Sequence, residues 1–124
     1  MPATRRDRRS ELGAVTAEAA VMLPVLVLLA LGLAWLVTLG ATQVRVLDAA
    51  RETARAAARG EDLSTSVGLG RRVASDGARF SVRDEGDTIE VRVDAPVRGP
   101  GGIFAFLPTY SASASAVAAK EPGS

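Results

Sequence analysis

One carboxylate, Glu18, stands out in this sequence because it lies at the edge of a long run without charges. The 24 residues from Ala19 to Thr42 contain no charged side chain. A helix of that length reaches about 36 Å at about 1.5 Å per residue, which is enough to cross a hydrocarbon core of about 30 Å with some tilt. An unpaired carboxylate at the centre of a bilayer costs up to about 2.5–3.5 kcal/mol, and less near its edge. We therefore expect Glu18 to have a partner.

A partner for Glu18 exists if the chain is cut after Gly13. Ala14 would then carry a free amine, and Glu18 would be the fifth residue of the shortened chain. The two residues are one helical turn apart, so the carboxylate can pair with its own or a neighbouring subunit's ammonium and complement the helix dipole. Glycine suits an extended peptidase substrate, because it has no side chain to obstruct access. The alternative interpretation of Glu18 is an incidental charge at the boundary of a membrane anchor.

Other reactive groups are scarce in this chain. The 124 residues include no cysteine and no histidine, which excludes thiol nucleophiles, Ser-His-Asp triads, disulfides and zinc sites with the usual ligands. Residues 68–71 (Gly-Leu-Gly-Arg) lack the third glycine and the Lys-Ser/Thr ending of a phosphate loop. Asp84, Glu85 and Asp87 share one predicted turn, but their spacing is wrong for a calcium loop. We therefore expect no enzymatic activity, no cofactor, no metal site and no small-molecule substrate.

The charge-free run is best explained as a single-pass membrane helix. The other 100 residues carry all 29 charges of the chain and are poor in large apolar residues, so they cannot cover the run on all sides. The apolar region of a cleaved secretory signal is shorter, about 7–15 residues. Arginines 5, 6, 8 and 9 before the run are matched by arginines 45, 51, 55 and 59 after it, so the positive-inside rule gives a tie on orientation.

The residues around the start of this helix resemble a known family. A basic leader, Gly13, four small or apolar residues, Glu18 and an apolar helix with Pro24 are similar to type IV prepilins. Together with the Ala- and Arg-rich segment 49–60, this pattern resembles the TadE-like minor pilins (pseudopilins) of tight-adherence, or Flp, pilus systems. The resemblance implies cleavage between Gly13 and Ala14 by a prepilin peptidase at the cytoplasmic face of the membrane.

The resemblance also implies a location, a function and partners. The protein would reside in the plasma (inner) membrane with its N-terminus in the cytoplasm and its C-terminus outside, and it could enter a cell-surface pilus. Its partners would be the prepilin peptidase, the major Flp pilin, other minor pilins and the inner-membrane assembly platform, besides membrane lipid. Glu18 would set the axial register of subunits, whereas a kink at Pro24 needs no function, because neighbouring helices can satisfy the freed carbonyl.

An alternative function remains open from the residues alone. The chain could be an uncleaved single-pass anchor that acts as a scaffolding subunit of a secretion or envelope machine. Nucleic acid is not an expected partner, because Asp48 and Glu52 interrupt the arginine stripe that follows the apolar run and favour a solvated helix face.

The expected fold is α+β, with one long N-terminal transmembrane helix and a small extracytoplasmic head, as in type IV pilins. Residues 1–13 form the leader, residues 14–60 the long helix with its membrane segment 19–42, and Gly60 is placed to end the helix. A face of small residues should pack on the chain's own C-terminal part rather than form an inter-subunit seam. These residues are Ala49, Ala50, Thr53, Ala54 and Ala57.

Residues 61–124 should form the small head, in which a sheet of two or three antiparallel strands packs on the helix. The sequence predicts a short helix within 61–78, with Glu61 and Asp62 in its first turn and its exit at 76–77. Alternating apolar residues predict strands at 80–83, 89–94 and 109–117, a turn at 84–87, a loop at 95–108 and a frayed end from 118. Within the loop, Ile103–Leu107 is a candidate partner or membrane contact, or a cap on the core.

Overall fold

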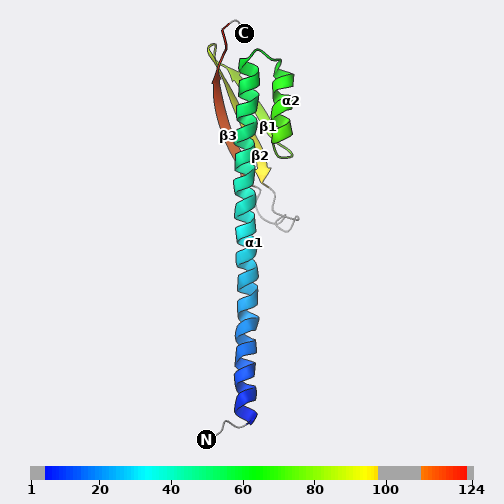
Figure 1. Cartoon of the computed structure of the whole chain (residues 1–124), viewed down its shortest axis with the longest axis vertical. Coiled ribbons are helices and arrows are strands. Elements are labelled where there is room, and N and C mark those ends of the chain that lie inside the picture. The colour runs from blue at the N-terminus through cyan, green and yellow to red at the C-terminus, as the bar shows by residue number, and fades with distance from the viewer. Residues whose placement is uncertain (1–4, 98–109, 123–124) are drawn as a thin grey trace. The chain divides into compact units, whose positions relative to one another are not determined.

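The computed structural model describes residues 5–97 and 110–122 of the 124-residue chain (Figure 1). Its elements are helices α1 (Arg5–Ala58) and α2 (Leu63–Val73) and strands β1 (Arg79–Asp84), β2 (Thr88–Val97) and β3 (Tyr110–Ala119). The chain divides into two compact units, Met1–Ala34 and Trp35–Ser124, which we call the N-terminal and the C-terminal unit. The expected α+β class, with a long apolar helix and a three-stranded antiparallel sheet packed against it, is confirmed.

The N-terminal unit contains the first part of α1. The helix begins at Arg5, earlier than the expected start at Ala14, because the Arg, Glu and Leu residues of the leader are strong helix formers and extend it. Pro24 lies inside α1 without ending it. The helix is long and apolar enough to cross a membrane, and its most apolar window is not buried against any described part of the chain.

The C-terminal end of α1 has a specific cap at the glycine that the sequence predicts. Gly60 adopts φ = +87°, a left-handed conformation that glycine takes without steric cost. Its amide donates to the Ala57 carbonyl at 3.1 Å, and the Glu61 amide donates to the Ala56 carbonyl at 3.3 Å. These two bonds form a Schellman motif, which satisfies carbonyls that the helix end would otherwise leave unpaired.

Helix α2 follows the cap almost directly. It ends at Val73, before the exit expected at 76–77, and Glu61 and Asp62 precede it instead of occupying its first turn. The Asp62 carbonyl accepts hydrogen bonds from the backbone amide of Ser66 at 2.9 Å and from its hydroxyl at 3.0 Å. The predicted short helix is therefore present, with its start held by a serine rather than by acidic side chains.

The sheet has the strand order β1-β2-β3, and both pairs are antiparallel. The turn between β1 and β2 lies where the sequence predicts it. The Glu85 amide donates to the Thr88 carbonyl at 2.9 Å, and Gly86 adopts φ = +92°. β3 pairs with β2 along the full length of both strands, so the predicted third strand completes the sheet.

Two segments that the sequence predicts as irregular belong to strands instead. Residues 95–97 continue β2 rather than opening a loop, and residues 118–119 lie in β3 rather than in a frayed end. β1 begins at Arg79, opposite Asp94, so the last residues of β2 pair only with β3 among the described strands. A strand with one unpaired side tolerates proline, which explains how Pro96 fits. The candidate segment Ile103–Leu107 lies outside the described residues.

The core of the C-terminal unit lies between α1 and one face of the sheet. The helix contributes Val46, Ala49, Ala50 and Ala54, and the strands contribute Ile89, Val91, Val93, Ala95, Val97 and Ala112. The expected packing of the small-residue helix face on the chain's own C-terminal part is therefore confirmed. The arginines at 45, 51, 55 and 59 on the same helix are exposed, as expected for a solvated face.

Glycine at position 70 allows α2 to approach α1 and β1 closely. A Cβ added there would lie 2.8 Å from Phe80 Cε1 and 3.0 Å from the Ala49 carbonyl oxygen, and closer still to the Thr53 hydroxyl. The Thr53 side chain is fully buried, and its hydroxyl has no hydrogen-bond partner in the part of the chain that the structure describes. These contacts leave no room for a side chain at Gly70.

We therefore predict that Gly70→Ala destabilises the C-terminal unit by about 1–3 kcal/mol, the usual cost of overpacking. The loss of stability can be measured by urea unfolding of the full-length protein in detergent. The fluorescence of the single tryptophan, Trp35, reports the unfolding transition. The matched control is Gly68→Ala, because a Cβ at Gly68 would meet no atom within 4 Å beyond its chain neighbours and the adjacent helix backbone. That change should stabilise α2 by up to about 1 kcal/mol. Equal changes in the free energy of unfolding of the two variants, in the same direction, would contradict the close packing at Gly70.

Candidate functional site

The four positions singled out in the sequence all lie on α1 within the N-terminal unit. Gly13, Ala14, Glu18 and Pro24 are exposed, and a Cβ placed at Gly13 would meet no atom within 4 Å other than those of its chain neighbours and the adjacent helix backbone. Ala14 and Glu18 are four residues apart on one continuous helix, so their side chains share a face. The structure thus leaves all four positions accessible to another molecule.

Gly13 lies in helical rather than extended backbone, because α1 runs through it. A peptidase that binds an extended substrate would require the helix to unwind at this place. A glycine inside a helix costs about 0.5–1 kcal/mol relative to alanine. The helix is therefore weakened locally at the position where the sequence predicts cleavage.

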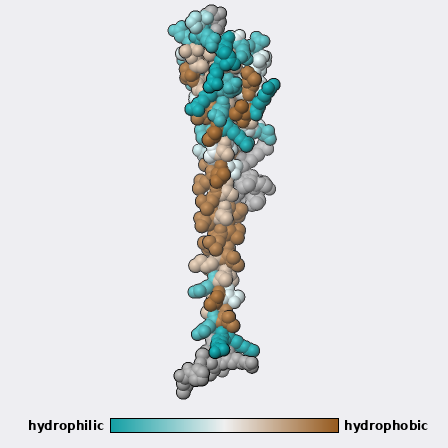
Figure 2. Space-filling view, viewed as in Figure 1, coloured by the Kyte–Doolittle hydropathy of each residue, from teal (hydrophilic) through white to brown (hydrophobic). Residues whose placement is uncertain are grey.

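The surface of α1 around Glu18 and Pro24 is apolar and uncovered. Its exposed large residues include Val21, Met22, Leu23, Val25, Leu26, Val27, Leu28, Leu29 and Leu33. In Figure 2, hydrophobic residues gather along α1, whereas the visible surface over α2 and the sheet is mostly hydrophilic. A helix that is apolar all round is stable in the core of a protein or within a membrane. Because no described residue covers it, this surface fits a single-pass membrane protein.

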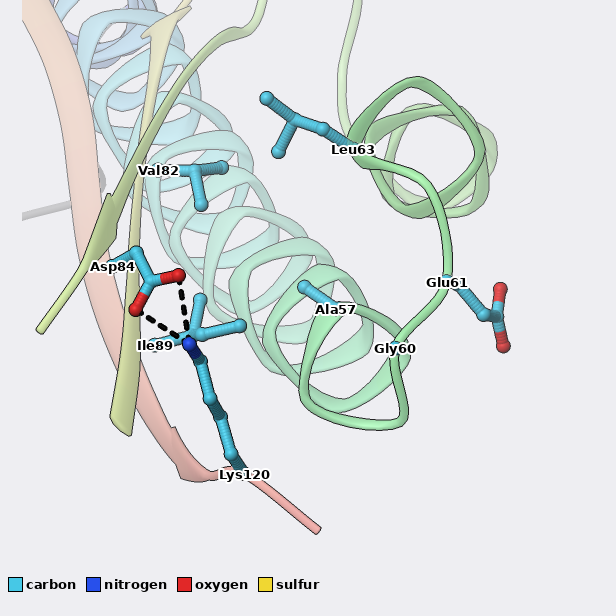
Figure 3. A pocket seen from close by; sticks show the side chains of 8 residues that line it. All are labelled: Ala57, Gly60, Glu61, Leu63, Val82, Asp84, Ile89 and Lys120. Carbon is cyan, nitrogen blue, oxygen red and sulfur yellow. Dashed lines mark hydrogen bonds and ion pairs between the residues drawn. The ribbon is translucent and has the colours of Figure 1, made fainter. Parts of the chain in front are cut away.

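A cavity of about 370 Å³ opens in the C-terminal unit beside the end of α1, the start of α2 and the β1–β2 hairpin (Figure 3). The apolar side chains of Ala57, Leu63, Val82 and Ile89 line it. Asp84 and Lys120 stand together on one side, and the Glu61 side chain points away from them. Glu61 instead accepts a hydrogen bond of 2.8 Å from Arg59.

The Asp84–Lys120 pair connects the end of β1 to the residue that follows β3. The Lys120 ammonium lies 2.7 Å from one carboxylate oxygen of Asp84 and 2.8 Å from the other. The hydrogen bond from Lys120, followed by that from the Gly86 amide, holds the pKa of Asp84 below its usual value of 3.8. The Lys120 amide also donates to the Asp87 carbonyl at 2.9 Å. The pair therefore fastens the last strand to the hairpin turn.

The cavity offers little for catalysis. Asp84 and Lys120 neutralise each other, and no group of three or more metal-ligating side chains occurs among the residues that the structure describes. The sequence places Asp84 in the turn but does not identify Lys120 as its partner. The strand order could have indicated it, since a third antiparallel strand ending near Val117 brings the following residues beside the first hairpin turn.

Comparisons with known proteins connect the chain to one family. The sequence model of the TadE-like protein family matches residues 13–55. A Mycobacterium tuberculosis protein described as an apoptosis inhibitor is 40% identical over 108 residues, which cover 86% of this chain and 79% of that protein. No solved structure matches the chain significantly. The family match begins at Gly13 and ends within the last turn of α1.

The Asp84–Lys120 pair leads to a prediction about acid. Because the pKa of Asp84 is lower in the folded than in the unfolded chain, the pair's stabilisation is present above about pH 3.8 and is lost as the pH falls through the lower folded value. We expect the Lys120 amide to lose protection from hydrogen exchange in that acid range and, in Asp84→Asn, at neutral pH as well. Asp87→Asn, in the same turn, is the control that should keep protection. Full protection in Asp84→Asn would contradict the fastening role.

Proposed function

Because the chain belongs to the TadE-like protein family, we propose that it is a minor pilin, or pseudopilin, that takes part in assembly of a tight-adherence (Flp-type) type IV pilus. Membership of this family supports involvement in that pilus system and a structural rather than a catalytic role. The observation that carries the finer proposal is the uncovered apolar helix α1, which has Gly13, Ala14 and Glu18 exposed at its N-terminal end.

In this proposal a prepilin peptidase removes residues 1–13 at the cytoplasmic face of the inner membrane. Two observations support the position of the cut. The family match begins at Gly13, so the basic leader lies outside it. Gly13 is also exposed and weakens the helix locally, which favours the unwinding that a peptidase needs.

Glu18 then pairs with the ammonium group of Ala14 on its own or a neighbouring subunit. On α1 the two residues share one face, and a carboxylate near the start of the helix complements the positive end of the helix dipole. In an assembly where lipid is replaced by other helices, this pair fixes the axial register. The apolar surface of α1 packs against the major Flp pilin and other minor pilins, and the assembly platform in the inner membrane receives the subunit.

The proposal places the residues after α1's apolar run outside the cytoplasm. Cleavage at the cytoplasmic face requires the leader to be inside, and a single membrane crossing then puts α2 and the sheet on the other side. The activity named for the mycobacterial relative is a property of that protein and forms no part of this proposal.

A second candidate function is an uncleaved single-pass anchor that acts as a scaffolding subunit of a secretion or envelope machine. One observation favours it, because α1 is continuous through Gly13 and the structure has no break between the leader and the apolar run. The two functions differ in whether residues 1–13 are present in the working protein.

Replacing Gly13 tests the processing step. We predict that Gly13→Leu, co-expressed with a prepilin peptidase, keeps its leader, because a bulky side chain obstructs the cut. Intact mass spectrometry of the protein from membranes measures this as retention of residues 1–13. The control is Gly32→Leu, an equally open position further along α1, which should be processed normally. A Gly13→Leu protein that still loses residues 1–13 would exclude this cleavage position.

Replacing Glu18 tests the register role. We predict that Glu18→Ala still inserts in membranes. The amount that co-purifies with the major pilin should fall at least about tenfold, since a charge-assisted hydrogen bond contributes about 1.5–3 kcal/mol. Cross-linking followed by co-purification measures the recovery. Glu11→Ala, which lies in the leader, is the matched control. Normal recovery of Glu18→Ala would remove the register role while leaving the processing step intact.

A further inference from the structure

A second cavity lies in the C-terminal unit where α1 leaves its charge-free run. We call it the foot cavity. It has a volume of about 290 Å³, and its lining includes Thr38, Thr42 and Arg45 of α1, Ser75 and Asp76 after α2, and Pro96 of β2. The foot cavity is therefore large enough for a small polar group, and its lining combines hydroxyls with two charges.

The two charges of the foot cavity, Arg45 and Asp76, are of opposite sign. Neither Arg45 nor Asp76 forms an ion pair or a side-chain hydrogen bond with any residue that the structure describes. Other charged side chains of the same unit, such as Arg92 and Lys120, do form pairs. An arginine and a carboxylate on one cavity can thus serve a ligand that carries both an anion and a cation.

The position of the foot cavity along α1 indicates where such a ligand would be. Arg45 is the first charged residue after the run that ends at Thr42. Trp35, one turn before Thr38, contacts Tyr110 edge-to-face with 6.4 Å between ring centroids. Trp and Tyr are enriched at membrane interfaces, where an apolar ring and a polar tip meet the headgroup layer. If α1 spans a bilayer, the foot cavity therefore opens into that layer.

Phospholipid headgroups differ in how well they match this pair of charges. Phosphatidylethanolamine carries a phosphodiester and a primary ammonium group. A guanidinium binds phosphate oxygens with two hydrogen bonds, and a carboxylate accepts hydrogen bonds from an ammonium. Phosphatidylglycerol has the phosphate but no cation, so it would leave Asp76 unpaired beside a second negative charge.

We propose that the foot cavity binds the headgroup of a phospholipid that carries an ammonium group, with Arg45 holding the phosphate and Asp76 the ammonium. The inference rests on the proposed function, because it requires α1 to span a membrane. It adds a lipid-binding site at the base of the extracytoplasmic part, which anchors the C-terminal unit to the membrane surface before the subunit is extracted into a pilus.

The single tryptophan of the chain gives a direct readout. The full-length protein is reconstituted in phosphatidylglycerol vesicles that contain a small fraction of one lipid with a nitroxide quencher near the top of its acyl chain. The labelled lipid is either phosphatidylethanolamine or phosphatidylglycerol. We expect labelled phosphatidylethanolamine to quench Trp35 as strongly as if this lipid were about tenfold more concentrated around the protein than in random mixing. Labelled phosphatidylglycerol should quench Trp35 only as strongly as random mixing predicts.

Variants connect this preference to the two residues. Arg45→Ala and Asp76→Asn should each reduce the quenching by phosphatidylethanolamine to that of random mixing. Arg51→Ala removes the same charge from an exposed site on α1 outside the cavity lining, and it should keep the preference. Circular dichroism confirms that the variants fold, which is expected for changes at exposed positions.

Two results would overturn the inference, and they differ in what else they affect. Equal quenching by the two labelled lipids in the wild-type protein, or an unchanged preference in both cavity variants, excludes the foot cavity as the site and leaves the pilin proposal standing. If neither lipid quenches Trp35, α1 does not cross the bilayer, and the proposed function is overturned as well.

Discussion

The C-terminal unit depends on how closely its sheet can approach α1, and that distance is set by small side chains. Ala49, Ala50 and Ala54 on the helix and Ala95 and Ala112 on the strands are almost fully buried. Aromatic residues make up only 4% of the chain, so few large aromatic side chains are available to fill a wider gap. Close contact between short side chains therefore has to supply the packing that a larger core would obtain from aromatic residues.

The surface of α1 has two different environments along the length of the helix. In the C-terminal unit one helix face is occupied by the chain's own sheet, and the opposite face carries solvated arginines. In the N-terminal unit no described residue covers the apolar window of the helix, and from Ala19 onward its side chains are uncharged and mostly large and apolar. A single helix thus serves as the backbone of a small α+β fold and offers an apolar surface to lipid or to other subunits.

Much of this fold follows from local sequence patterns. The end of α1 at Gly60 and the hairpin turn at Gly86 depend on residues close in sequence, and both lie where the pattern predicts. The start of α1 was less predictable, because helix formation spreads from the apolar run into a leader whose residues favour helix. Pro96 can lie in a strand because β1 does not extend alongside it, and no local pattern contains that information.

The candidate sites show the same difference between features set by residues close in sequence and features set by contacts between distant residues. Gly13, Ala14 and Glu18 could be singled out because their spacing along one helix determines which faces they share. Contacts between distant residues could not, since Lys120 meets Asp84 across 36 positions of sequence and Arg45 and Asp76 share a cavity only through the packing of α1 and the segment after α2. Gly70 is another example, because a side chain at this position would clash with Thr53 and Phe80 on other elements.

The central claim of the account is that the working protein starts at Ala14, with Glu18 one helical turn from a free amine. N-terminal sequencing of the wild-type protein, purified from the membranes of cells that make it together with its pilus system, tests this most directly. The account predicts a sequence that begins Ala-Val-Thr-Ala-Glu. A sequence that begins at Met1 or Pro2 would contradict it and would support the uncleaved anchor instead.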